Sequence, residues 1–89
     1  MNKLNETLEQ RGNRYGSMVS NAHFTQELMR MTLEFDKENQ LTDVHLECLH
    51  MIYHKIARMV VGDCMYSDNA IDIAGYAQLL ADYIDGDKS

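Results

Sequence analysis

The sequence predicts an all-α fold, an antiparallel helical bundle of one short and three longer helices. The chain of 89 residues contains no proline, the residue that most strongly breaks a helix. Three stretches repeat apolar residues at helical spacing, and short segments rich in Gly, Asn, Ser and Thr separate them. A single domain this small buries only about 60–65% of its unfolded surface. We therefore expect a dimer.

The chain is expected to be one domain, 1–89, that opens with a short helix and a loop in residues 1–17. Leu4 and Leu8 lie one helical turn apart near the N-terminus. The loop has the sequence RGNRYGS, and its glycine, asparagine and serine residues are typical of turns.

The three longer helices are expected at residues 19–38, 43–61 and 68–85. Thr42 is a good N-cap, with an acidic residue directly after it to meet the helix dipole. Gly62 is a natural residue to end the same helix. The apolar positions at helical spacing form the expected core: Phe24, Leu28, Met31 and Phe35 in the first long helix, and His45, Leu49, Ile52, Ile56, Met59 and Val60 in the second.

The last helix is apolar on two sides. One side carries small residues, and a second stripe carries Tyr76, Leu79 and Tyr83. A helix of this kind packs between neighbours, so we expect it to be either the central element or the oligomer interface. The flexible side chain of Met51 suits an adaptable contact surface, and we group it with these three residues as a predicted interface.

Charge and cysteine content limit the class of function. The net charge of −6 argues against nucleic-acid binding and is compatible with docking onto a basic protein surface. The sequence shows no apolar run of 18 residues, so no membrane contact is expected. Cys48 and Cys64 form no CxxC motif, which fits a reducing cytoplasm.

Two groups of side chains are candidate metal ligands. Glu47, His50 and His54 share one side of a helix and can hold a metal ion, or simply form a solvated or partner-facing stripe. Asp68 and Asp72, one turn apart, can hold Mg²⁺ through their oxygens. Alternatively, Asp68 caps the last helix, and Asp72 forms an ion pair with Lys55 or Arg58 across the turn.

The RGNRYG loop is a candidate phosphate site. The forked guanidinium groups of Arg11 and Arg14 match phosphate oxygens, and the ring of Tyr15 can stack on a base. Lys55 is a further candidate to bind phosphate. An ordered surface turn anchored by the tyrosine explains the same residues.

The motifs RGNRYG, HKIAR, the GD turn and DIAGYA together resemble a family of small uncharacterised phage proteins found in podoviruses of enterobacteria. The resemblance covers roughly residues 9–83. The last two helices are also similar to the all-α nucleotide pyrophosphohydrolases of the MazG type. Those enzymes hold Mg²⁺ with an ExxE pair and an ExxD pair and cleave nucleoside triphosphates to monophosphates. This resemblance implies a Mg²⁺ site at Glu47, Asp68 and Asp72.

The present chain departs from that pattern, because His50 stands where a second carboxylate would help. Glu47 also lies 11 residues before Arg58, or roughly 16 Å along a helix at about 1.5 Å per residue. If Arg58 is level with Asp72, one protomer cannot place Glu47 and Asp72 on the same ion.

The sequence therefore favours a phage-encoded protein without a cofactor that acts in the host cytoplasm. It would bind and modulate or inhibit a host enzyme, such as an ATP-dependent protease, a polymerase or a defence factor. The alternatives are a Mg²⁺-dependent nucleotide pyrophosphohydrolase and a non-catalytic nucleotide binder.

Overall fold

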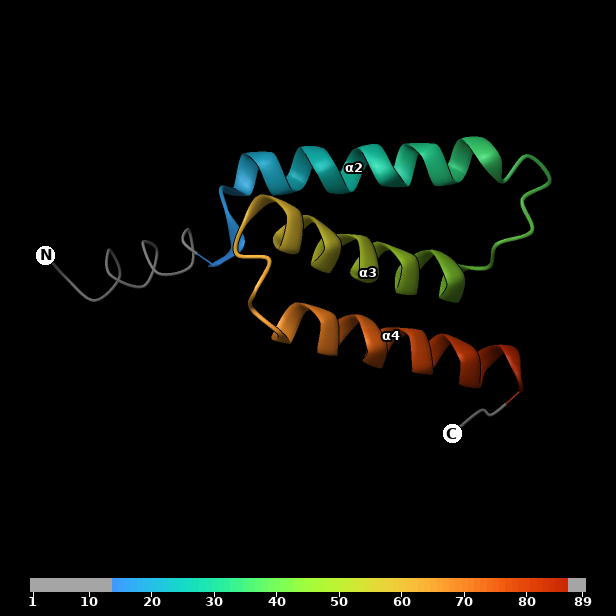
Figure 1. Cartoon of the computed structure of the whole chain (residues 1–89). Helices are drawn as coiled ribbons and strands as arrows, with labels where there is room; N and C mark the ends of the chain where they lie inside the picture. The colour runs from blue at the N-terminus through green and yellow to red at the C-terminus, as the bar shows by residue number, and fades with distance from the viewer. Residues whose placement is uncertain (1–13, 87–89) are drawn as a thin grey trace, which may run out of the picture.

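The computed structural model describes residues 14–86, and within them it contains three helices and no strand. They are α2 (Met18–Phe35), α3 (Asp43–Val61) and α4 (Asp68–Ile84). Successive helices run in opposite directions (Figure 1). The all-helical class is confirmed for this part of the chain, whereas the predicted short helix before the RGNRYGS loop lies outside the described residues.

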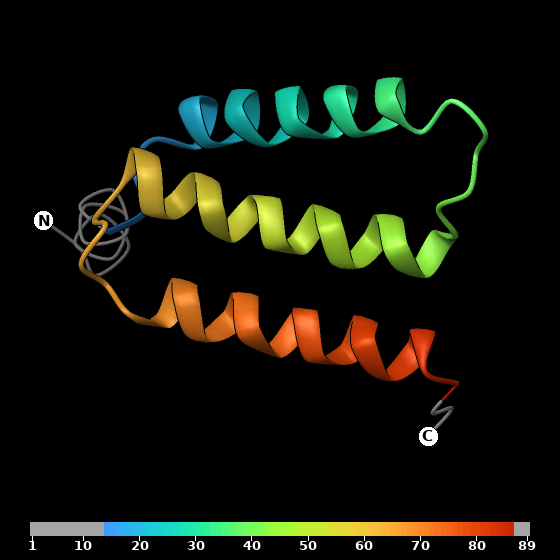
Figure 2. The ribbon, with the colours of Figure 1, turned by 45° about the vertical axis from the view of Figure 1, so that its right-hand side comes forward.

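The three helices form a single layer with α3 in the middle. α3 packs against α2 on one side and against α4 on the other, and the two edge helices stay apart in both views of the ribbon (Figures 1 and 2). The prediction that the last helix is the central element is wrong, because α4 lies at the edge. Its alternative role as an oligomer interface stays a prediction.

Local side-chain contacts set the bounds of α2. The hydroxyl of Ser17 caps its first turn by accepting a hydrogen bond from the backbone N–H of Ser20, at 3.1 Å. The helix ends three residues before the predicted position. The carboxylate of Asp36 accepts hydrogen bonds from the backbone N–H groups of Gln40 (2.8 Å) and Leu41 (3.2 Å), which fold the chain into the connection to α3.

The bounds of α3 coincide with the predicted range, and a capping box explains its start. The Thr42 hydroxyl accepts from the His45 backbone N–H, and the imidazole Nδ1 of His45 accepts from the Thr42 backbone N–H, each at 3.3 Å. α4 begins after Ser67, whose side chain makes no capping hydrogen bond, and ends one residue earlier than predicted.

The layer buries few apolar side chains. Among the described residues, the only hydrophobic ones that are buried are Cys48 and Ala57, both on α3. Several predicted core residues are instead exposed, including Phe35 (76%), Val60 (62%) and Met31 (56%). The prediction of a buried stripe is wrong there because a helix in a single layer has a neighbour on one or two sides only. The residues that it presents on the two faces of the layer therefore stay exposed to solvent.

No helix within residues 14–86 is long and apolar enough to cross a membrane.

Candidate functional site

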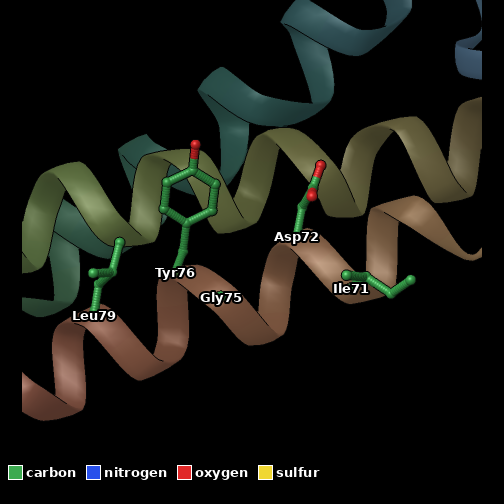
Figure 3. A pocket seen from close by; sticks show the side chains of 5 residues that line it. All are labelled: Ile71, Asp72, Gly75, Tyr76 and Leu79. Atoms are coloured by element: carbon green, nitrogen blue, oxygen red, sulfur yellow. The ribbon is translucent and has the colours of Figure 1, made fainter.

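A shallow, open hollow lies on the surface of α4. Its lining residues are Ile71, Asp72, Gly75, Tyr76 and Leu79. Figure 3 shows Gly75 between Ile71 and Leu79 along α4, with the side chains of Tyr76 and Asp72 extending toward α3. A Cβ added at Gly75 would meet no atom within 4 Å. The hollow therefore lies over Gly75, where the helix carries no side chain. We call the side of the layer that bears these five residues the hollowed face.

The rims of the hollow are apolar and accessible. Ile71 and Leu79 are 62% and 60% exposed, because no described element covers them. Two of the predicted interface residues, Tyr76 and Leu79, line this hollow. Ile71 and Gly75 are not among the predicted interface residues. Their spacing, with Leu79, of i, i+4 and i+8 nevertheless places all three on one row of the helix.

The other two predicted interface residues pack differently. Tyr83 lies against α3, where its ring meets the edge of the His45 ring at a centroid distance of 5.9 Å. Met51 is half-buried on α3. The exposed part of the predicted interface is therefore concentrated at the hollow.

An ion pair borders the hollow. Lys55 Nζ on α3 lies 3.0 Å from Asp72 Oδ2 on α4. The Lys55 side chain is largely covered (13% exposed), whereas that of Asp72 is 45% exposed. The pair ties the edge helix to the middle one, and it leaves part of the carboxylate facing solvent beside the apolar rim. Of the two partners considered for Asp72, Lys55 is the one present.

Arg58 instead joins a stacked cluster at the end of the layer. Its guanidinium lies 4.4 Å from the Tyr15 ring, and that of Arg14 lies 4.9 Å from the Tyr66 ring. The two tyrosine rings are 6.1 Å apart and tilted by 58°. Such cation–π contacts hold Arg14 and Tyr15 against the end of α3 and the turn that follows it.

This arrangement supports the anchoring role of Tyr15 and separates the predicted phosphate ligands. Arg14 stacks on Tyr66, and Lys55 pairs with Asp72. Arg11 lies outside the described residues. Tyr66 also donates a hydrogen bond to Asp68 at 2.7 Å, and this contact raises the pKa of the phenol.

The predicted Mg²⁺ ligands do not form one site within a protomer. Glu47 is exposed on α3, Asp68 accepts from Tyr66, and Asp72 is paired with Lys55. Across residues 14–86, no three His, Cys, Asp or Glu side chains gather closely enough to share a metal ion. The carboxylates of a single protomer therefore do not fit a Mg²⁺ site.

The histidine stripe on α3 lies among cations. Burial lowers the pKa of His54 below its ordinary value of 6.5, and the nearby charges of Arg58, Lys55 and His50 lower it further. A neutral imidazole is therefore favoured at this position.

Three buried polar residues lie at the helix contacts, and the sequence analysis gave no role to any of them. Asn21 donates through its amide to the carbonyl oxygens of Tyr15 and Ser17, the latter at 2.8 Å. Asn69 is 2% exposed and Thr25 is 2% exposed. The Asn69 amide nitrogen and the Thr25 hydroxyl have no hydrogen-bond partner among the described residues.

Comparison with protein-family models, with curated proteins and with solved structures finds no match to this chain.

Proposed function

We propose that this chain is a phage-encoded protein that acts by contact in the host cytoplasm, as a homodimer. It binds a host enzyme, such as an ATP-dependent protease, a polymerase or a defence factor, and changes the activity of that enzyme. The observation that carries the proposal is the hollow on α4, where Ile71 and Leu79 stand exposed on either side of Gly75.

The shape and charge of the hollow define the partner segment. An apolar side chain of the partner fits between Ile71 and Leu79, as in the docking of an amphipathic helix into a groove. α4 carries three aspartates and no lysine or arginine, and the chain as a whole has a net charge of −6. A partner helix with lysine or arginine beside its apolar anchor is therefore attracted to this face.

The test is capture of partners from an enterobacterial lysate with tagged protein. Leu79→Gln removes an apolar rim of the hollow and keeps a side chain of similar length. Met65→Gln is the matched control, because Met65 is also exposed (85%) but lies in the turn before α4. We expect one stoichiometric host enzyme with the wild type and the control, at least about tenfold weaker binding with Leu79→Gln, and altered activity of the purified enzyme in the complex.

Two results would count against the proposal. Equal capture by Leu79→Gln would show that the hollow is not the contact, and the absence of any stoichiometric host protein would remove the proposed function.

A second candidate function is that of a Mg²⁺-dependent nucleotide pyrophosphohydrolase, and the observation behind it is the pair of aspartates on α4. Asp68 and Asp72 lie one turn apart beside Lys55. The assay is release of pyrophosphate from a panel of nucleoside triphosphates with Mg²⁺ or Mn²⁺. Because Glu47 does not join the pair within a protomer, we expect no turnover. Activity that is lost in a folded Asp72→Ala variant would instead establish the enzyme.

A further inference from the structure

The buried residues show how each helix is rotated about its own axis, that is, which side of it faces the neighbouring helix. Asn21 and Thr25 mark the side of α2 that faces α3, and Asn69 marks the side of α4 that faces α3. Cys48 and Ala57 mark two opposite sides of α3. They are nine residues apart, which at about 100° per residue is a half-turn beyond two full turns.

On the side of the layer opposite the hollow, each helix presents one row of residues, and none of the three rows contains a charge. We call this side the uncharged face. Helical spacing places on it Phe24, Met31 and Phe35 from α2, Leu49, Ile56 and Val60 from α3, and Ile73, Ala77, Ala81 and Ile84 from α4. The nearest charged residues, Glu27 and Asp85, lie at its outer edges.

The uncharged face is accessible in the protomer. Phe35 is 76% exposed, Val60 62% and Ile84 61%. A connected apolar surface of several hundred Å² on a soluble chain is typical of a site that another molecule covers.

The size of the face is that of a dimer interface. The helices have 17 to 19 residues, which makes each about 26–28 Å long at about 1.5 Å per residue. Neighbouring axes lie about 8–10 Å apart, so one copy offers roughly 700 Å². Two copies would bury roughly 1,400 Å² in total, within the usual range of about 1,200–2,000 Å² for a stable interface.

The face is complementary to itself. Its α2 row is bulky, its α4 row has two alanines, Ala77 and Ala81, between isoleucines, and the middle row belongs to α3. A two-fold axis parallel to the helices, passing over the middle row, lays α2 of one copy on α4 of the other. The large ring of Phe35 can then meet a small residue of the other copy, which is how packed layers interdigitate.

The positions of residues along the helix axes agree with this pairing of α2 on α4. Thr32 of α2 is bonded to Tyr53 of α3, and Lys55 of α3 is paired with Asp72 of α4. Counting from these two contacts along antiparallel neighbours places Phe35 at about the level of Ala77. Phe35 of each copy therefore faces Ala77 of the other copy.

We infer that a second copy of this chain covers the uncharged face, so that two helical layers pack face to face with their hollowed faces outward. This rests on the homodimer of the proposed function and names its contact. Two chains of net charge −6 repel each other, so an apolar face without carboxylates is the surface on which they can meet.

The test is sedimentation equilibrium of the full chain at micromolar concentrations, for the wild type and two variants. Ala77→Glu puts a carboxylate into the proposed interface, whereas Gln78→Glu puts the same charge on the adjacent residue at the outer edge of α4. Both positions are exposed in the protomer, and glutamate is a good helix former.

We expect the wild type to have the mass of two chains. Ala77→Glu should raise the dimer dissociation constant by at least about a hundredfold, because it buries an unpaired charge. Gln78→Glu should change it by less than about threefold. A wild type that stays monomeric, or two variants that weaken the dimer equally, would overturn the inference.

Circular dichroism checks that each variant keeps the wild-type helix content. If Ala77→Glu does not, Phe35→Gln tests the opposite side of the same contact from another helix. Failure of the dimer is distinguishable from failure of the proposed function, because partner capture depends on Leu79 and sedimentation on Ala77.

Discussion

At the scale of single residues, two glycines allow residues 14–16 to cross the end of α3. Gly16 has a φ of +78°, in the left-handed region that glycine adopts without cost. At Gly62 a Cβ would collide with the carbonyl oxygen of Arg14 and would come within 2.6 Å of the Tyr15 Cα. The close approach lets the backbone N–H of Asp63 donate to the Arg14 carbonyl at 2.7 Å. Gly62 is thus kept small by a crossing segment that lies far from it in sequence.

The first prediction compares alanine at two glycines. Gly62→Ala should lower the free energy of unfolding by about 1–3 kcal/mol, because backbone atoms block the new methyl group. Gly75→Ala should raise it by about 0.5–1 kcal/mol, because the position is helical and open. Denaturant unfolding at constant protein concentration measures both. Equal destabilisation by the two variants would show that the crossing at Gly62 is not tight.

The second prediction concerns His54 and pH. Its pKa is lowered in the folded state, chiefly by burial, so in the range below pH 6.5 the unfolded chain binds more protons at this residue. The free energy of unfolding therefore rises with pH through that range and falls on acidification. His54→Gln should remove this contribution, so that the variant loses less stability than the wild type between pH 7 and pH 5. Parallel curves for the two proteins would contradict the shift.

Sequence alone identified the residues whose partners are local. The cap at Thr42 needs only the residues that follow it, and Lys55 and Asp72 are close because a short turn joins their helices. The stacking of Arg58 on Tyr15 brings together residues 43 positions apart in the chain, since 58 − 15 = 43. No periodicity encodes such a contact.

At the scale of the elements, the start of each helix depends on different side chains. α3 has a complete capping box, whereas Ser67 precedes α4 without a side-chain hydrogen bond. Helical periodicity predicted where these helices lie, because each has an apolar row. It could not predict which rows are buried, because that depends on how many neighbours a helix has.

The third prediction compares the two caps. Thr42→Ala should lower the free energy of unfolding by about 1 kcal/mol, because it removes the acceptor for an N–H of the first turn. Ser67→Ala should cost only a few tenths of that, because no such bond is present. Thermal or denaturant unfolding measures the difference. A larger loss at Ser67 than at Thr42 would contradict the assignment of the caps.

At the scale of the whole molecule, three helices in one layer cannot enclose a core. Only two apolar side chains are buried among the described residues, and Phe35, Val60, Ile71 and Leu79 are among those left exposed on the two faces. The excess of apolar residues on the last helix was visible in the sequence. Its division into an uncharged face and a hollowed face required the order of the helices in space.

A second copy of the chain is proposed to cover the uncharged face and a host enzyme to bind the hollowed face. A disulfide cross-link tests this division most directly. Cys64 is exposed, so it is first replaced by serine. In that background Phe35→Cys is combined either with Ala77→Cys on the uncharged face or with Leu79→Cys on the hollowed face. α2 and α4 lie on opposite sides of α3, about 16–20 Å apart, too far for a disulfide within one chain.

Mild oxidation of each double variant with diamide, followed by non-reducing electrophoresis, gives the answer. We predict that the pair Phe35→Cys and Ala77→Cys is converted to a covalent dimer, because the two-fold axis brings the thiols of different copies together. The pair Phe35→Cys and Leu79→Cys should stay monomeric. Cross-linking of both pairs to the same extent, or of neither, would contradict the face-to-face dimer.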